Sequence, residues 1–203
     1  MDATKIRLSP EEEALVTRAD WILTKNSVLQ KTMQLFATLQ TEQKTWMESN
    51  ENSWPDHIIN TSPKISRGEN YLGLPWLMLD YPRVFNKEEI FAVRTFFWWG
   101  NFFSVTLQLS GKYQDEYSEG LIHAYPELSK QGFFVCIQDE QWHHHFGEDN
   151  YQPVSTMMAT EWHTLIRKKS FVKIADTVPL EDWNYAREKL MKIFRQLMQK
   201  MTG

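Results

Sequence analysis

The run from Ile90 to Ser110, IFAVRTFFWWGNFFSVTLQLS, limits the fold of this chain more than any other stretch. Most of its residues are β-branched or aromatic, and such residues favour β-strands. Gly100 and Asn101 stand near its middle. A two-residue turn that begins with Gly joins antiparallel strands well, because Gly adopts positive φ without strain. The run therefore predicts a β-hairpin at the centre of a sheet.

The turn also predicts which residues of the hairpin pair and which face they share. With Gly100 and Asn101 as the loop, Trp99 pairs with Phe102 and Arg94 pairs with Leu107. Because side chains alternate along a strand, one predicted face is apolar except for its arginine: Ile90, Ala92, Arg94, Phe96, Trp98, Phe103, Val105, Leu107 and Leu109. The other is apolar only near the turn: Phe91, Val93, Thr95, Phe97, Trp99, Phe102, Ser104, Thr106 and Gln108. We expect helices to cover the first face completely and the second in part.

Residues 9–49 show the signals of two helices. Ser9, Pro10 and Glu12 predict a helix start with a side-chain cap, Pro in the first turn and a capping box. Asn26 and Ser27 predict a break before the second helix. At helical spacing, the expected inner stripes are Leu15, Ala19 and Ile22, then Leu29, Met33, Phe36, Leu39 and Trp46. One bent helix is the alternative interpretation.

The rest of the chain supplies further elements around the hairpin. Strands are expected at 71–80, 132–138, 142–146 and 171–175, with turns at 81–83 and 139–141. Helices are expected at 155–167, with Met158, Trp162 and Leu165 inward, and at 180–200. The inner stripe of the last helix would be Trp183, Ala186, Leu190, Ile193, Leu197 and Met201. Residues 49–70 and 111–131 are expected to be irregular connections.

The order of these elements predicts an α+β fold, because strands and helices do not alternate regularly. We expect an antiparallel sheet built on the 90–110 hairpin and packed by two N-terminal helices and a long C-terminal helix. A chain of 203 residues suits a single domain. Its parts would be a helical N-terminal part at 9–49, a sheet-forming part at 71–176 and the C-terminal helix at 180–201.

Composition argues against several classes of protein. Cys136 is the only cysteine, so no internal disulfide can form, and we expect a buried strand thiol in a cytoplasmic protein. A net charge of -4 argues against a nucleic-acid partner. There is neither a secretory signal nor an apolar run of about eighteen residues, which predicts a soluble protein without a membrane partner. The aromatic content of 14% is high and predicts a well-filled core or an aromatic-lined surface.

Arg94 is the first candidate site residue. A guanidinium on the apolar face of a central strand must be paired, because its desolvation is costly. A structural ion pair with Asp80 on the neighbouring strand is one interpretation, and an anion-binding arginine at the floor of a cleft is another. A third is that the pairing is shifted by one residue, which would place Arg94 on the exposed face.

The polar segment from Lys64 to Tyr71 is expected to be a loop that leads into a strand. Loops on a rigid scaffold commonly carry binding residues, so Arg67, Glu69 and Tyr71 are candidate ligand-binding residues at one end of the sheet. Trp99 is a further candidate, because the second face of the hairpin is rich in aromatic side chains near the turn. An ordinary surface loop is the alternative, and no phosphate-binding loop motif is present.

The cluster Trp142-His143-His144-His145 is the third candidate. On a strand, His143 and His145 would share one face and could present two imidazoles to one divalent metal, with a carboxylate or another histidine completing the site. The alternative is a set of solvent-facing or hydrogen-bonded histidines. No other cofactor is predicted, because the chain contains no dinucleotide, zinc-protease or nucleophile-elbow motif.

Two functions follow from these candidates. The first is a small-molecule- or protein-binding domain with a polar pocket beside the central sheet, using Arg94, Arg67, Glu69, Tyr71 and Trp99. The second is an enzyme that uses His143 and His145 with a carboxylate, with or without a metal. The position of Arg94 relative to the two histidines discriminates between them, because an enzyme needs its charged groups to converge on one cavity.

Overall fold

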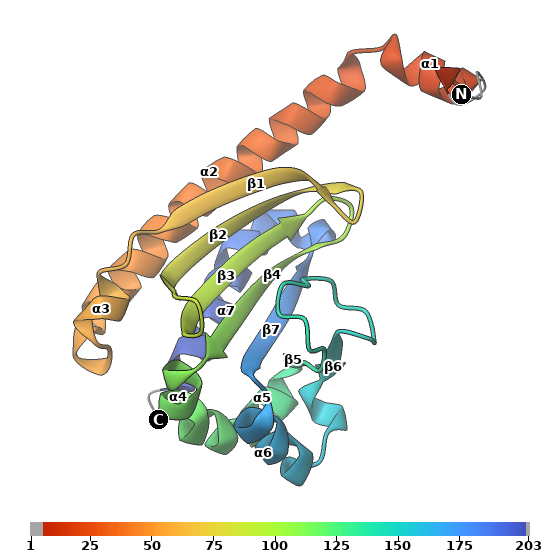
Figure 1. The fold of residues 1–203 in the computed structure, drawn as a ribbon. Coiled ribbons are helices and arrows are strands. Elements are labelled where there is room, and N and C mark those ends of the chain that lie inside the picture. Colours follow the sequence, from red (N-terminus) through yellow and green to blue (C-terminus); the bar gives the residue numbers. More distant parts are fainter. Residues whose placement is uncertain (1–5, 202–203) are drawn as a thin grey trace.

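Seven antiparallel strands form one sheet in the computed structural model, which describes residues 6–201 (Figure 1). The strands are β1 (Lys64–Tyr71), β2 (Leu74–Phe85), β3 (Ile90–Trp98), β4 (Phe102–Ser110), β5 (Phe134–Cys136), β6 (Tyr151–Pro153) and β7 (Phe171–Pro179). Their order in the sheet is β1-β2-β3-β4-β7-β5-β6. The 90–110 hairpin, β3 and β4, lies in the middle of this order. The expected α+β fold built on this hairpin is confirmed.

The helices are α1 (Pro10–Val16), α2 (Asp20–Ser49), α3 (Asp56–Ile59), α4 (Lys112–His123), α5 (Tyr125–Gln131), α6 (Ala159–Lys168) and α7 (Ala186–Gln199). Three short 3₁₀ segments, η2 (Glu51–Ser53), η3 (Val154–Thr156) and η4 (Leu180–Tyr185), adjoin them. Within residues 6–201, no helix is both long enough and apolar enough to cross a membrane.

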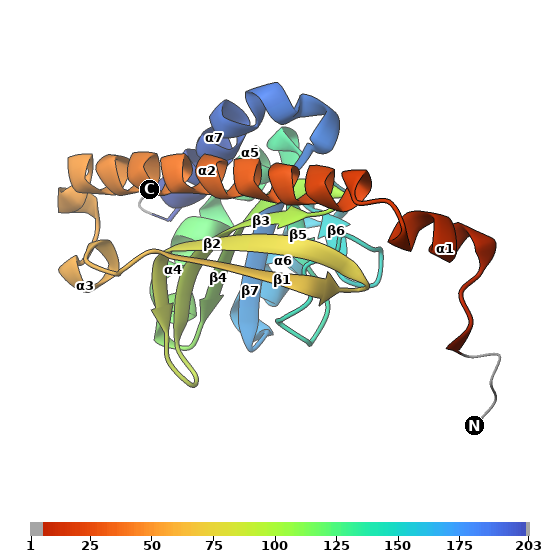
Figure 2. The same ribbon diagram turned by 90° about the horizontal axis from the view of Figure 1, so that it is seen from above.

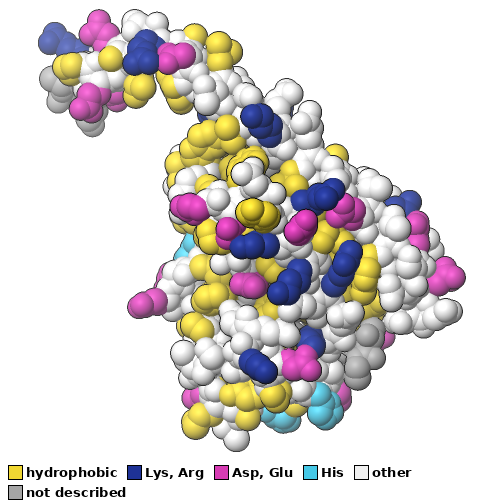
Figure 3. Space-filling model, turned by 180° about the vertical axis from the view of Figure 1, so that it is seen from behind, with side chains coloured by type: hydrophobic (Ala, Val, Ile, Leu, Met, Phe, Trp, Pro, Cys, Tyr) yellow, Lys and Arg dark blue, Asp and Glu magenta, His cyan; other side chains and the backbone are white. Residues whose placement is uncertain are grey.

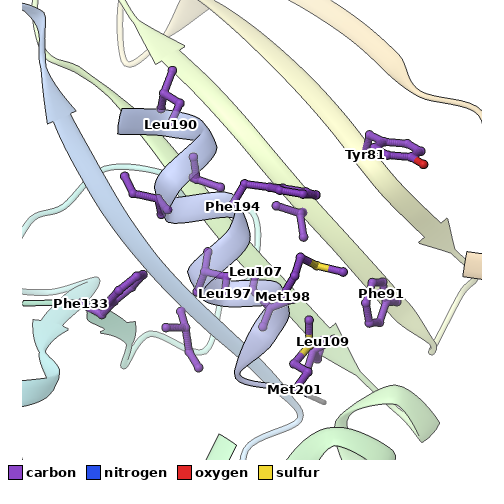
Figure 4. Packing of buried hydrophobic residues seen from close by; sticks show 14 of the residues in the cluster. Tyr81, Phe91, Leu107, Leu109, Phe133, Leu190, Phe194, Leu197, Met198 and Met201 are labelled. Carbon is purple, nitrogen blue, oxygen red and sulfur yellow. The ribbon is translucent and has the colours of Figure 1, made fainter. Parts of the chain in front are cut away.

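Helices α2 and α7 cover one face of the sheet (Figure 2). The C-terminal helix packs by the stripe that its sequence predicts, because Leu190, Ile193 and Leu197 belong to the core cluster. Phe194 and Met198, outside that stripe, are buried in the same cluster (Figure 4). The hairpin side chains in the same core cluster are Phe91, Val93, Phe97, Phe103, Val105, Leu107 and Leu109. This face therefore holds the main apolar core.

The predicted register of the hairpin is wrong by one residue. Trp98 pairs with Phe102 and Arg94 pairs with Thr106, so Trp99, Gly100 and Asn101 together form the loop. The Trp99 N–H donates to the Pro75 carbonyl oxygen at 3.0 Å, so its backbone bonds toward β2 rather than across the hairpin. A shift of one residue turns every β4 side chain to the other face.

The corrected register gives the hairpin one apolar face and one mixed face. The mixed face, which carries Arg94, also bears Ser104, Thr106 and Gln108 of β4. Arg94 is therefore not an isolated cation among apolar side chains, as the predicted pairing implied. The one-residue shift in pairing, which was the third interpretation of Arg94, does occur. It leaves Arg94 largely buried, however, rather than exposed.

The N-terminal part departs from the predicted pair of helices. Asn26 and Ser27 lie inside α2, which is continuous over 30 residues, and the break falls at 17–19 instead. The predicted capping box of Ser9 and Glu12 is present. However, α1 contains no buried residue and projects from the body (Figures 2 and 3), so Leu15 is exposed rather than inward.

The second predicted stripe is confirmed, because Phe36 and Leu39 of α2 are fully buried. The break expected at Asn26 fails because cap-forming side chains are only a weak preference. Continuing the helix carries this apolar stripe across the sheet, and tertiary packing supplies most of the stability of a helix.

Several connections expected to be irregular are ordered elements. Lys64–Tyr71 is the edge strand β1, the predicted turn at 81–83 lies inside β2, and 111–131 forms α4 and α5. The register between β2 and β3 shifts between Asp80 and Arg83, and an irregularity of this kind admits Pro82 within a strand. Met158, expected to point inward, is exposed because α6 begins only at Ala159.

Residues 142–146 are not a strand, and β6 at 151–153 pairs with β5 in their place. They belong to the long β5–β6 loop, residues 137–150, which covers the mixed face of the sheet. The ring of Phe146 meets Phe102 of β4 edge-on, and the ring of His144 lies beside Phe96 of β3. The second sheet face is thus covered by this loop rather than by helices.

Candidate functional site

Arg94 forms an ion pair with Asp80, its register partner on β2. The Arg94 Nε donates to Asp80 Oδ1 at 2.8 Å, and only 12% and 7% of the two side chains are exposed. The structural ion pair expected from the sequence is therefore confirmed. The guanidinium also packs beside two aromatic rings that contact each other, 5.5 Å from the Phe85 centroid and 5.6 Å from the Trp142 centroid.

Side-chain amides continue this polar cluster beneath the β5–β6 loop. Arg94 Nη1 donates to Gln108 Oε1 at 3.5 Å, and Gln108 Nε2 donates to Gln141 Oε1 at 3.0 Å. Gln108 belongs to β4 and Gln141 to the loop. The cluster therefore ties the loop to the centre of the sheet.

Lys173 of β7 places a second cation on the same face, next to Gln108 in the register. Its side chain is fully buried, its Nζ donates to the His143 carbonyl oxygen, and it lies 5.3 Å from the centroid of the Tyr151 ring. Burial, together with the nearby Arg94, lowers the pKa of Lys173 to about 8, against the opposing effects of Cys136 and Glu140. Burial also raises the pKa of Tyr151 well above its usual value.

The side chains of the three consecutive loop histidines point to alternate sides, as was predicted for a strand, although the segment is not a strand. His144 is turned toward the sheet, where burial and the nearby Arg94 hold its pKa well below its usual value. The rings of His143 and His145 lie side by side, with centroids 5.5 Å apart. The Tyr71 hydroxyl accepts hydrogen bonds from the backbone N–H of His144 and of His145, at 2.6 and 3.1 Å.

The metal hypothesis lacks a third ligand in this geometry. Asp149 Oδ1 lies 3.9 Å from His145 Nδ1, and the Gly147 N–H donates to that same nitrogen at 3.3 Å. Across residues 6–201, no group of three or more His, Cys, Asp or Glu side chains could hold a metal ion. His143 and His145 do lie on the same side of the sheet as Arg94, as the enzyme hypothesis requires.

Two neighbouring cavities open between α2 and the edge of the sheet. The first, about 660 Å³, is lined by Asn26, Leu29, Gln30, Met33, Gln34, Arg67, Gly68 and Glu69. The second, about 550 Å³, is lined by Trp21, Thr24, Lys25, Glu69, Gly73, Leu74, Pro75 and Trp99. Glu69 belongs to both, and its Oε2 lies 2.5 Å from Lys25 Nζ. The first cavity has a polar wall and the second is walled largely by aromatic and aliphatic side chains.

The structure separates the predicted ligand-binding residues into two groups. Arg67, Glu69 and Trp99 line the two cavities beside α2. Tyr71 and Arg94 lie on the opposite face, under the β5–β6 loop. The expectation that Trp99, Phe97 and Phe102 share one face is wrong, because the register shift sends Phe102 to the loop side.

Sequence reasoning missed Trp21, Lys25, Gln108, Gln141 and Lys173. Trp21 and Lys25 could not be found, because their helix was expected to pack by another stripe. Lys173 did carry a signal, since it stands between apolar residues in a short strand pattern, FVKIA. A cation at such a position is a buried charge unless the strand is an edge strand.

Comparison with models of known protein families, with curated proteins and with solved structures finds no match to this chain. The arrangement of its own residues is therefore the basis on which its function is inferred.

Proposed function

We propose that this protein binds a small amphipathic molecule in the two cavities beside α2. The apolar body of the ligand would lie between Trp21 and Trp99, and its polar end would reach Glu69 and Lys25. The observation that carries the proposal is the second cavity, in which two tryptophans from distant parts of the chain face a space bordered by an ion pair.

The dimensions and chemistry of the site support this proposal. A volume of about 550 Å³ falls within the range of ligand pockets, which are mostly apolar with a few placed polar groups. The walls come from α2, from β1 and β2 with the turn that joins them, and from the β3–β4 loop, so most of the cavity rests on regular elements. Sites built on such elements hold their geometry well.

The shared Glu69 gives the ligand a polar anchor. Lys25 is largely buried, with 17% of its side chain exposed, whereas 66% of Glu69 is exposed. Arg67 and the amides of Gln30 and Gln34 continue the polar surface into the first cavity. A ligand longer than the apolar cavity would therefore meet hydrogen-bonding groups rather than further apolar surface.

Binding of anilinonaphthalene sulfonate, an aromatic probe with one anionic group, tests the proposal. We expect saturable fluorescence enhancement by the folded protein, weakened at least about tenfold by Trp99→Ala and by Trp21→Ala. Glu69→Gln should strengthen binding, because it leaves the Lys25 ammonium free to meet the sulfonate. Near-ultraviolet circular dichroism would show that each variant keeps its tertiary packing.

Trp142→Ala is the matched control, because Trp142 and Trp21 are each 46% exposed but lie on opposite sides of the sheet. Its affinity for the probe should equal that of the unaltered protein. Equal weakening by all three tryptophan substitutions, or no weakening by any, would overturn the proposed site.

We infer a cytoplasmic location for this activity, since a lone buried thiol at Cys136 and no disulfide suit a reducing compartment. The proposal includes no nucleic-acid partner, because the chain has a net charge of -4. A protein partner at the same apolar surface remains the alternative within this class. The enzyme hypothesis has less support, because His143 and His145 lie on the same side of the sheet as Arg94 but lack a third ligand within the described residues.

A further inference from the structure

The orientation of the Gln108 side chain is fixed by its neighbours. Arginine can only donate hydrogen bonds, so the oxygen of Gln108 must face Arg94 Nη1, as it does at 3.5 Å. The nitrogen of Gln108 is thereby directed to Gln141 Oε1, at 3.0 Å. The three side chains form one directed chain, in which each acceptor oxygen of the two amides is already engaged.

The groups of Arg94 and Gln141 that remain without a partner are donors. Arg94 Nε is used by Asp80 and Nη1 by Gln108, whereas Arg94 Nη2 and Gln141 Nε2 have no hydrogen-bond partner among residues 6–201. Neither nitrogen is one of the fully buried, unpartnered side-chain atoms of that part of the chain, which are Gln43 Oε1 and the Tyr151 hydroxyl. Both donors therefore reach the molecular surface.

Two cations and two carboxylates lie around these donors. Arg94 and Lys173 lie on the same sheet face, where Asp80 pairs with Arg94 and the Glu140 carboxylate acts on Lys173. A guanidinium and an amide that both keep free N–H donors favour an anion that accepts hydrogen bonds.

We propose that Arg94 Nη2 and Gln141 Nε2 bind an oxyanion, the carboxylate or phosphate group of a small molecule, at the molecular surface beside the β5–β6 loop. The rings of Phe85 and Trp142, whose centroids are 6.5 Å apart, both pack beside the guanidinium. Asp80 orients the guanidinium from the opposite edge. This site is separate from the cavities beside α2, so either can fail without the other.

Titration of the ¹⁵N-labelled protein with sodium phosphate and with sodium acetate tests the site, with sodium chloride at the same ionic strength as reference. The Arg94 Nε–H resonance, identified by its absence in Arg94→Lys, should shift saturably with at least one oxyanion and not with chloride. A response to phosphate alone or to acetate alone would identify the group that the site prefers. Either response supports the proposal.

Arg94→Lys should weaken binding at least about tenfold, because a lysine keeps the charge but loses the planar fork. Since this variant has no Arg94 Nε–H, its binding is measured from the backbone amide resonances that shift during the titration. Gln141→Ala, which leaves the Arg94–Asp80 ion pair in place, should weaken it several-fold, and the unshifted backbone amides of the central strands would show that the sheet is intact. Arg187→Lys is the matched control, since Arg187 also pairs with a carboxylate, Glu42, but is well exposed. The proposal is overturned if neither oxyanion gives a saturable shift beyond that of chloride. It is equally overturned if Gln141→Ala binds as tightly as Arg187→Lys.

Discussion

Single buried charges define the mixed face of the sheet. Asp80 and Arg94 neutralise each other at 2.8 Å, and breaking such a pair leaves an uncompensated ion at a cost of about 3–5 kcal/mol. Lys173 has no carboxylate partner among the described residues and is held by the His143 carbonyl and the Tyr151 ring. Its ammonium is therefore stabilised less completely than the guanidinium of Arg94.

Replacing Lys173 with Met should change how stability depends on pH. The pKa of Lys173 is about 8 in the folded protein and 10.5 in an unfolded chain, so the unfolded state binds more protons between these values. The stability of the unaltered protein should therefore rise with pH in this window, relative to Lys173→Met. We expect a gain of about 2 kcal/mol between pH 7.5 and 9.5.

Urea denaturation of both proteins across that pH range would measure the difference. The difference between their free energies of unfolding removes the contribution of tyrosine titration, because both proteins contain the same tyrosines. Lys168→Met is the control, because Lys168 is exposed and should give no pH-dependent difference. A constant difference between the unaltered protein and Lys173→Met across the window would contradict the lowered pKa of the Lys173 ammonium.

Among the elements, α1 and α2 are stabilised by different kinds of contact. The central part of α2 packs Phe36, Leu39 and Met47 into the main core. By contrast, α1 buries no residue, and its neighbourhood exposes several large apolar side chains: Ile6, Leu8, Leu15, Val16, Trp21 and Leu23. Its order therefore rests on its capping box and on local bonds such as that from Trp21 Nε1 to the Leu15 carbonyl oxygen.

Removing residues 1–17 should leave the stability of the remaining protein nearly unchanged. We expect the free energy of unfolding to change by less than about 0.5 kcal/mol, because no buried contact of α1 is lost. Chemical denaturation of the full and shortened chains would measure the change. A loss of several kcal/mol would show that α1 packs on the body in solution.

At the scale of the whole molecule, one core joins nearly every element. The same cluster of buried side chains draws on α2, α4, α6, α7 and the central strands, including Phe36, Leu121, Trp162, Phe194 and Val105. Smaller clusters on the loop side contain Cys136, Tyr151 and Phe171, and Met78, Phe96 and Trp98. The loop side thus has less apolar burial than the helix side.

We predict that the chain unfolds as a single cooperative domain. Calorimetric and van't Hoff enthalpies should agree, because a shared core couples the elements. A chain of 203 residues should give a total unfolding enthalpy of about 140 kcal/mol near 60 °C. A separate early transition, assigned by hydrogen exchange to β5, β6 and their loop, would contradict this prediction.

Much of the secondary structure was determined by the sequence alone. The strands of the hairpin, the capping box at Ser9 and the inner stripe of α7 follow from residue type and periodicity, which are local properties. The burial of Cys136 follows in the same way from its apolar strand. The pairing of Arg94 with Asp80 was one of three interpretations that the sequence left open, and the structure decided among them.

Only the tertiary structure decided the register of the hairpin, the continuity of α2 and the partners of the site residues. The register shift leaves Trp99 in the loop, where its N–H donates to Pro75, and turns all of β4 to the opposite face; no local pattern encodes it. Likewise, Trp21 and Trp99 come together only because a long helix crosses the end of the sheet. Contacts between distant segments depend on the packing of the whole chain, so the sequence predicted the elements of this protein better than its sites.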